Sequence, residues 1–265
     1  MMAIAIFTSN QPRHIAFLRA AAARFDDIVA FVEVTTIFPG EVEDFYAGSP
    51  TMKSYFTHVR AAERAVFGTL APMPAGVRVL PMRMGDIAHL RADDVAEHLA
   101  GRTVLVFGAS FIRPPLVDLL ISGGALNIHA GIAPHYRGNS CNFWALSDGR
   151  PELVGTTVHR LTRGLDTGAV LFHALPVPKA YDPFQLGMHA VRAGQTALLD
   201  AVASGRIEHL AAAPQDPAHR IRYTKRAEFT DAVAQAFLDT PLDAASIGRR
   251  LAGTTPEGLI NPVYL

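Results

Sequence analysis

Two polar side chains alternate with apolar ones in residues 126–130, which read Leu-Asn-Ile-His-Ala. Alternation with a period of two is typical of a strand, and it places Asn127 and His129 on the same face. An amide N–H beside an imidazole suits acyl transfer, because the amide can stabilise a developing oxyanion and the imidazole can carry a proton. The pair therefore predicts a catalytic site at the carboxyl end of a strand, where open α/β sheets place their binding crevices.

This pair lacks a carboxylate that could orient and charge the imidazole. Asp166 is the candidate, because Gly164 and Gly168 mark a sharp turn around it. An Asn-x-His pair also occurs by chance, and an aspartate in a glycine-rich turn is usually a turn former. On the residues alone, the catalytic and the purely structural interpretations both stay open.

Three separated motifs resemble those of the folate-dependent formyltransferase family: Asn-Ile-His at 127–129, Pro-x-Tyr-Arg-Gly at 134–138 and Leu-Asp-Thr-Gly at 165–168. The resemblance covers residues 104–202. It implies that Asn127, His129 and Asp166 are catalytic and that 10-formyltetrahydrofolate is the formyl donor. The family usually follows its histidine with Pro-Ser, whereas Ala130 and Gly131 stand here. This departure predicts a looser loop and removes any role of that serine.

The resemblance also implies a folate pocket, formed by the loop at 108–114 and by the turn that leads to Asp166. Backbone groups at strand ends can recognise a flat heterocycle with a fixed edge of donors and acceptors. A plain connection between a strand and the helix at 116–122 is the alternative for the loop. The predicted folate-binding residues are Gly108, Phe111, Ile112, Arg113, Arg163, Gly164 and Leu165.

Polar residues at the start of the first predicted helix form a candidate acceptor site. No Gly-x-Gly-x-x-Gly follows the first strand, which argues against an NAD-binding site, and the Gly-rich phosphate loop of the glycinamide ribonucleotide enzymes is missing too. A helix N-terminus favours an anion, but ordinary surface polarity explains the same residues equally well. The predicted substrate-binding residues are Asn10, Arg13, His14, Tyr136 and Arg137.

Buried strands alternate with helical segments along most of the chain. The apolar runs at 3–8, 28–34 and 103–107 are typical of parallel strands that are covered on both faces. Residues 154–161 and 169–177 are expected to pair antiparallel across the Asp166 turn. Apolar periodicity and capping residues predict helices that begin at Pro12 and span 52–67, 116–122, 142–147 and 183–203. These elements predict an α/β fold with a Rossmann-like, mostly parallel sheet and helices on both faces.

The remaining segments are less regular. An exposed loop is expected at 41–46. Gly187 and Gly194 are expected to let the helix at 183–203 lie close to the sheet. We divide the chain into a catalytic domain, residues 1–205, and a small C-terminal extension, residues 206–265. In the extension, residues 220–225 favour a strand. Residues 240–243, Thr-Pro-Leu-Asp, resemble a capping box and predict the start of a short helix that ends near Gly253.

Composition argues against several classes of protein. The whole chain has 24 basic and 24 acidic residues, and the residues from Pro214 onward are balanced as well, so no field attracts nucleic acid or a membrane. The single cysteine, Cys141, excludes a disulfide framework and is expected to pack at a helix start rather than act as a nucleophile. No metal site is predicted. The N-terminus shows no leader, so a cytoplasmic protein is expected, and a homodimer is the commonest assembly.

Together these features predict an N-formyltransferase that moves a formyl group from 10-formyltetrahydrofolate to a primary amine. By elimination, the acceptor is a small molecule, either an amino sugar nucleotide or an amino-acid-like metabolite. A 10-formyltetrahydrofolate hydrolase, in which water replaces the amine, is the nearest alternative, although the regulatory domain that usually precedes such hydrolases is missing. A folate-binding protein without catalysis is the other alternative, and the intact Asn-His-Asp set argues against it.

Overall fold

The computed structural model describes residues 2–34, 49–69 and 72–265, and the loop expected at 41–46 lies outside them. The strands of its main sheet are β1 (Ala3–Ser9), β2 (Asp27–Val34), β3 (Val77–Arg83), β4 (Thr103–Val106), β5 (Leu126–His129), β7 (Thr156–Arg160), β8 (Val170–Leu175) and β10 (Val263–Tyr264). A separate parallel pair consists of β6 (Tyr136–Gly138) and β9 (Arg222–Thr224).

The helices at 12–22, 50–67, 116–122, 141–147 and 183–203 agree closely with the predicted segments. The helices of the structure are α1 (Pro12–Ala22), α3 (Pro50–Phe67), α4 (Ala92–Leu99), α5 (Leu116–Ser122), α6 (Cys141–Ser147), α7 (Pro183–Ala203), α8 (Asp231–Asp239) and α9 (Ala244–Gly253). Of the helices in the described ranges, none combines the length and the apolarity that crossing a bilayer demands.

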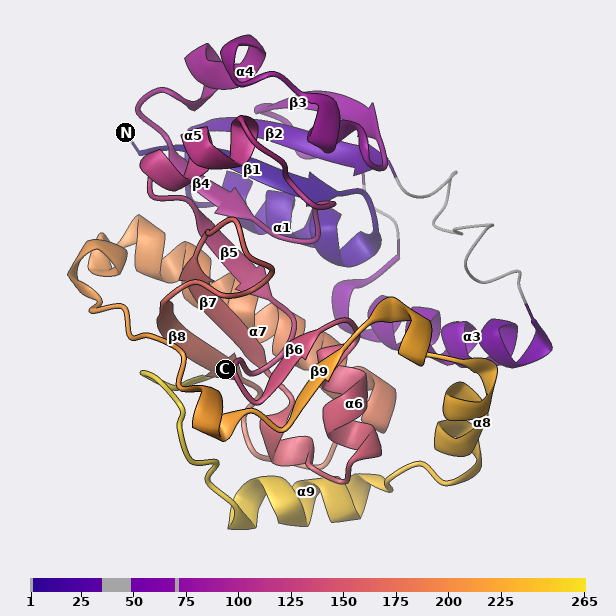
Figure 1. Ribbon diagram of the computed structural model, residues 1–265. Helices are drawn as coiled ribbons and strands as arrows, with labels where there is room; N and C mark the ends of the chain where they lie inside the picture. Colours follow the sequence, from indigo (N-terminus) through magenta and orange to yellow (C-terminus); the bar gives the residue numbers. More distant parts are fainter. Residues whose placement is uncertain (1, 35–48, 70–71) are drawn as a thin grey trace.

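The described strands form an eight-stranded sheet in the order β10-β8-β7-β5-β4-β1-β2-β3 (Figure 1). Neighbouring strands are parallel except at β7, which is antiparallel to both β5 and β8. The chain leaves β1 toward β2 and β3 on one side and returns to β4 and β5 on the other. This reversal of strand order opens a crevice at the carboxyl ends of the central strands, and the predicted mostly parallel α/β fold is confirmed.

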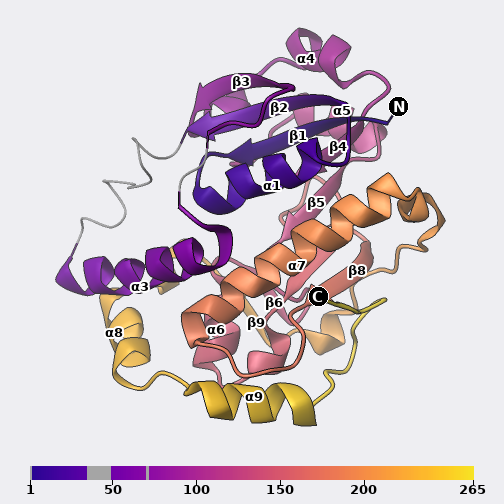
Figure 2. The same ribbon diagram turned by 180° about the vertical axis from the view of Figure 1, so that it is seen from behind.

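Helices cover both faces of the sheet, with α1 and α7 on one side and α4 and α5 on the other (Figures 1 and 2). Strand β1 shows why its apolar run is continuous. Ile4 and Ile6 pack into the core under α1 and α7, whereas Ala5 and Phe7 pack into the core under α4 and α5. Each face of the strand is buried, so neither set of side chains is polar.

Helix α7 lies directly on β7. It begins at Asp182, whose carboxylate accepts hydrogen bonds from the backbone N–H groups of Phe184 (2.9 Å) and Gln185 (3.1 Å). A Cβ at Gly194 would overlap the Thr156 hydroxyl, so the predicted close approach is confirmed there. The same prediction is wrong for Gly187, because its nearest neighbour would be Asn142 of α6, at 3.9 Å.

Residues after 205 return to the main body of the molecule (Figure 1). Strand β10 pairs with β8, β9 pairs with β6, and α8, which the sequence pattern did not predict, packs against α3. The predicted start of α9 is wrong. Asp243 caps this helix by accepting from Ser246 N at 2.8 Å, whereas Thr240 donates to Ala236 O and closes α8. The division at residue 205 stays a prediction.

Candidate active site

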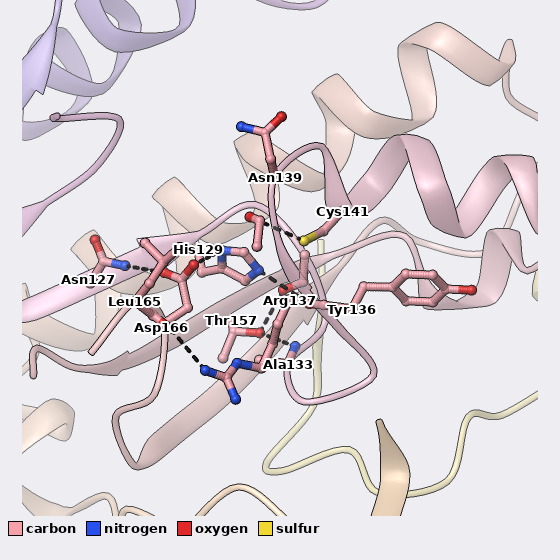
Figure 3. Close-up of polar contacts among 12 residues, drawn as sticks. Asn127, His129, Ala133, Tyr136, Arg137, Asn139, Cys141, Thr157, Leu165 and Asp166 are labelled. Carbon is pink, nitrogen blue, oxygen red and sulfur yellow. Dashed lines mark hydrogen bonds and ion pairs between the residues drawn. The ribbon is translucent and has the colours of Figure 1, made fainter. Parts of the chain in front are cut away.

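Asn127, His129 and Asp166 meet at the carboxyl end of β5 (Figure 3). His129 Nδ1 lies 3.1 Å from Asp166 Oδ2, and Asn127 Nδ2 lies 3.4 Å from the second carboxylate oxygen, Oδ1. The side chains of His129 and Asp166 are only 7% and 10% exposed, so their contact is shielded from water. The structure thus brings together the three residues that the sequence analysis singled out for catalysis.

The His129–Asp166 pair is charged at neutral pH. Burial alone lowers the pKa of His129, but the Asp166 carboxylate, followed by Cys141, raises that pKa well above its ordinary value. Burial likewise raises the pKa of Asp166, yet His129 and then His159 lower it well below the ordinary value of an aspartate. The two groups titrate as a coupled pair, and its stable form is an imidazolium beside a carboxylate.

Asp166 stands on a tightly constrained turn. Its φ of 50° lies in the left-handed region, which is unfavourable for a residue with a side chain. The turn closes at Gly168, where a Cβ would overlap the Arg160 carbonyl oxygen. Arg137 Nη2 donates to Leu165 O at 3.0 Å from the far side of the turn. Such local strain persists where surrounding contacts over-determine the backbone, as these contacts do.

A second histidine, His159 of β7, joins the cluster and was missed by the sequence analysis. It is the cross-strand neighbour of Asn127, and its Nε2 lies 3.0 Å from Asn127 Nδ2 and 3.6 Å from Asp166 Oδ1. His159 Nδ1 lies 2.8 Å from Arg160 O and must donate, because a carbonyl only accepts. The alternating pattern at 154–161 predicted this strand but left its register against β5 undetermined.

Asn127 Nδ2 therefore has two neighbours within the protein, His159 Nε2 and Asp166 Oδ1, that lie on the same side of the amide. The role of this amide as an oxyanion donor stays a prediction, and it requires that a ligand oxygen replace one of these neighbours. The 3.4 Å contact with Asp166 is the longer of the two, so an incoming oxygen atom can displace it at the smaller cost. The contact with His159 would then keep the amide oriented.

The loop after His129 is held firmly, contrary to the expected looseness. Thr157 Oγ1 donates to Gly131 O at 2.6 Å and accepts from Ala133 N at 2.8 Å. A Cβ at Gly131 would overlap that of Cys141 and lie 2.8 Å from His129 Nε2, which explains why no side chain stands there. Cys141 is buried at the start of α6 as predicted, with Sγ 3.6 Å from Gly138 O, and it also adjoins the His129 ring (Figure 3).

A cavity of about 320 Å³ opens beside the cluster, between the loop after β4 and the turn before Asp166. Phe111 and Leu165 line it and are 56% and 48% exposed, so two large apolar side chains are available for contact with a ligand. The other predicted site residues on its wall are Arg13, His14, Gly108, Ile112, Asn127, His129, Gly164 and Asp166. A larger hollow of about 610 Å³ lies at the opposite edge of the sheet, beside the amino ends of β4 and β5, away from this cluster.

The amino-acid sequence is similar to those of known proteins. Residues 88–202 match the family model described as formyl transferase. The methionyl-tRNA formyltransferase of Bordetella petrii is 31% identical over 193 residues, which are 70% of this chain and 58% of that protein. The chain belongs to the formyl transferase family. It spans less than two thirds of the length of this curated relative.

Solved structures of formyl transferases have the same fold. A sugar N-formyltransferase from Shewanella sp FDAARGOS_354 has a TM-score of 0.53 at 17% identity, covering 100% of this chain and 93% of that chain. Glycinamide ribonucleotide transformylase 1 from Symbiobacterium toebii has a TM-score of 0.52 at 22% identity, covering 82% and 95%. At these identities the likeness concerns the fold alone.

The loop at 108–112 is held by a buried carboxylate, Glu33, at the end of β2. Glu33 accepts hydrogen bonds from Ser110 N (2.7 Å), Ser110 Oγ (2.6 Å) and Gly85 N (2.7 Å). Gly108 has a φ of 67°, and a Cβ there would overlap the His14 ring. Glu33 is a supporting residue that the sequence analysis missed, since an acidic residue inside an apolar strand was the only signal.

The two predicted folate-binding arginines lie away from the cavity wall. Arg163 is 70% exposed, and its Nε pairs with Asp118 at 2.6 Å, while Arg113 is exposed and does not line the cavity. Their predicted contact with folate is not supported by this geometry. The backbone of the loop can still line the cavity, as the neighbouring Ile112 and Gly164 do.

The residues predicted to bind the acceptor lie in different surroundings in the structure. The geometry does not support the predicted contact of Tyr136 with the acceptor, because its side chain is 1% exposed, points away from the cluster and donates to Asp148 at 3.0 Å (Figure 3). Arg137 supports the Asp166 turn instead. Arg13 lines the cavity while its Nη1 pairs with Glu63 at 2.7 Å. Asn10 precedes α1 but is not part of the cavity wall.

Proposed function

We propose that this formyl transferase moves a formyl group from 10-formyltetrahydrofolate to the primary amine of a small acceptor. The observation that carries the proposal is the buried His129–Asp166 ion pair, 3.1 Å long, with the Asn127 amide beside it at the wall of a cavity. An amide donor and a lasting positive charge at one point suit a reaction that builds negative charge on a carbonyl oxygen.

The cavity residues fit a folate head group. A volume of about 320 Å³ is enough for the head of a ligand, and apolar walls with a few polar groups are typical of such sites. His14 Nδ1 is buried on this wall and has no hydrogen-bond partner among the described residues, which leaves a polar atom for a ligand. A structural neighbour, the sugar 3N-formyl transferase WlaRD, was solved in the presence of dTDP and 5-N-formyl-THF. 10-Formyltetrahydrofolate would supply a formyl carbon bound to nitrogen.

Each residue of the cluster has a defined task in this proposal. Asp166 keeps His129 protonated and oriented through Nδ1. The second ring nitrogen, Nε2, lies 3.4 Å from Tyr136 O, a long contact, so the imidazolium has an N–H to offer on this side. Asn127 offers the amide hydrogen that otherwise faces Asp166. Removing one such oxyanion donor typically costs ~10²–10³ in rate.

The proposed acceptor is an amino sugar nucleotide or an amino-acid-like metabolite. Support comes from the C-terminal segment, whose basic and acidic residues balance and so offer no field for a polyanion. Methionyl-tRNA is a second candidate, favoured by the 31% identity to the Bordetella petrii methionyl-tRNA formyltransferase. A tRNA acceptor would bind through its phosphates and would make turnover fall steeply with salt.

The test incubates the full chain with 10-formyltetrahydrofolate and one amine at a time, at low and at moderate salt. Amino sugar nucleotides, free amino acids and methionyl-tRNA are compared with a reaction that has no amine. We expect a mass gain of one formyl group on a small acceptor, with release of tetrahydrofolate. Formylation of methionyl-tRNA alone would replace the acceptor, and folate turnover without any amine would indicate a hydrolase. Folate binding without turnover would overturn the proposed activity.

We also propose that the protein is a cytoplasmic homodimer. The homodimer follows from the prevalence of this assembly among proteins, and the cytoplasmic location follows from the composition of the chain. Light scattering at tens of micromolar tests the assembly, and a monomeric mass would contradict it.

A further inference from the structure

A side chain from the C-terminal segment, Gln215, holds the turn that carries Asp166. Its Nε2 donates to Asp166 O at 2.7 Å and to Gly168 O at 3.0 Å. The chain just before Gln215 is held as well, because Ala213 and Val170 exchange two backbone hydrogen bonds of 2.8 Å at the start of β8. Gln215 therefore reaches the turn from a fixed support.

These contacts require a side chain that donates two hydrogens, which the Gln215 amide does. Both partners are carbonyl oxygens, which only accept, so a carboxylate at this position would repel them and an apolar side chain would leave them without a partner. The Oε1 atom of Gln215 is buried and makes no hydrogen bond in the described part of the chain. Turning the amide over would place this oxygen against two carbonyl oxygens, so the orientation follows from the partners.

The two carbonyl groups belong to the strained residue of the turn and to the residue two positions after it. Asp166 has its φ at 50°, and its carbonyl and that of Gly168 are the groups that Gln215 binds. A left-handed residue with a side chain relaxes unless its surroundings prevent it. Rotation of the backbone at Asp166 would carry the carboxylate away from His129 Nδ1, which lies 3.1 Å from it.

We propose that Gln215 is a positioning residue of the active site, through which the C-terminal segment holds the Asp166 carboxylate against His129. The segment from 206 onward is then part of the catalytic unit and is not an appendage. The effect on turnover rests on the proposed formyl transfer, whereas the effect on the His129–Asp166 pair does not.

The test compares Gln215→Met with Gln235→Met in the full chain. Gln235 is an exposed glutamine on α8 that pairs with Asp239, so the control makes the same chemical change away from the turn. The pKa of His129 is followed by NMR of its ring protons, alongside turnover from pH 6 to 9 and thermal unfolding. Gln215→Asn provides a milder variant if the methionine variant folds poorly.

We expect Gln215→Met to lower the pKa of His129 and to reduce turnover by roughly 10- to 100-fold, the scale of a misplaced catalytic group. The loss of turnover should be greatest above pH 7, and Gln235→Met should behave as the native chain. A shifted His129 in a protein that transfers no formyl group would support the positioning role while the proposed activity fails. A native His129 titration in both Gln215 variants would overturn the positioning role, whatever the native chain catalyses.

Discussion

His129 and Asp166 hold opposite charges where almost no water reaches them. Two charges withdrawn from water are stable only when their geometry is good and their remaining polar atoms are satisfied. Here Asp166 contacts His129 through Oδ2 and Asn127 through Oδ1, and His159 Nε2 lies 3.6 Å from Oδ1. Each of these side chains therefore acts on the same charge, and changing any of them alters the proton balance of the site.

Replacing Asp166 with asparagine should convert His129 into a neutral imidazole at neutral pH. Burial lowers the pKa of His129, and the variant lacks the carboxylate that overcomes this effect. We expect Asp166→Asn to reduce turnover by at least ~10²-fold, the usual contribution of a positioned acid or base. The loss should grow from pH 6 to 9, whereas the native chain should stay active until the raised pKa of His129 is passed. A parallel loss at every pH would contradict a charged His129.

Cys141 should tune the same histidine more weakly. It raises the pKa of His129 after the larger effect of Asp166. We expect Cys141→Ala to lower the pKa of His129 by less than Asp166→Asn does, with folate binding unchanged. Titration by NMR measures both variants directly, and Cys141→Ser serves as the conservative control. An unchanged titration in Cys141→Ala would show that the sulfur does not act on the ring.

At the scale of elements, helix α7 packs on β7, the strand that carries His159 into the cluster. The helix lies so close to β7 that its contact point must be a glycine, Gly194 against Thr156. Since Thr156 and His159 belong to the same short strand, a displaced helix would also disturb the cluster. Close packing of this kind tolerates little added volume.

Two glycines of α7 offer a matched test of that contact. Gly194→Ala should destabilise the fold by about 1–3 kcal/mol, because the new methyl group would overlap the Thr156 hydroxyl. Gly187→Ala should be neutral or stabilising by up to about 1 kcal/mol, since alanine favours helix and the nearest atom would lie 3.9 Å away. Urea unfolding of both variants measures the difference. Equal stability of the two variants would contradict the contact.

At the scale of the whole molecule, His173 of β8 links segments that are distant in the chain. It is fully buried, its Nε2 lies 2.8 Å from Ala133 O, and its Nδ1 accepts from Ile260 N at 2.9 Å. Burial lowers the pKa of His173 to about 4. The ring is therefore neutral in the folded protein, with Nε2 as the donor and Nδ1 as the acceptor.

His173 should make the fold sensitive to acid. Its folded pKa of about 4 lies below the ordinary value of 6.5, so the unfolded chain binds more protons between these pH values. The free energy of unfolding should be highest above pH 6.5 and should fall by roughly 3 kcal/mol toward pH 4 from this group. His14, whose pKa is also lowered by burial, acts in the same direction. Urea unfolding from pH 4 to 7 measures the slope, and His173→Gln should flatten it.

Much of this protein was determined by local patterns in its sequence. The bounds of α5 and α7 follow from capping residues and helical periodicity, and the buried strands follow from apolar runs, because these signals depend only on near neighbours. The spacing within 126–130 likewise placed Asn127 and His129 on one face. The residues that resemble a known family then identified Asp166 as their partner.

Only the tertiary structure decided what surrounds these three residues. His159 meets Asn127 through the register of β7 against β5, and Gln215 meets Asp166 across 49 positions of the chain. Tyr136 faces Asp148 and not the cavity for the same kind of reason, since the direction of a side chain in a short strand depends on what packs against it. Periodicity determines which residues share a face, but contacts between distant segments depend on packing that no local pattern encodes.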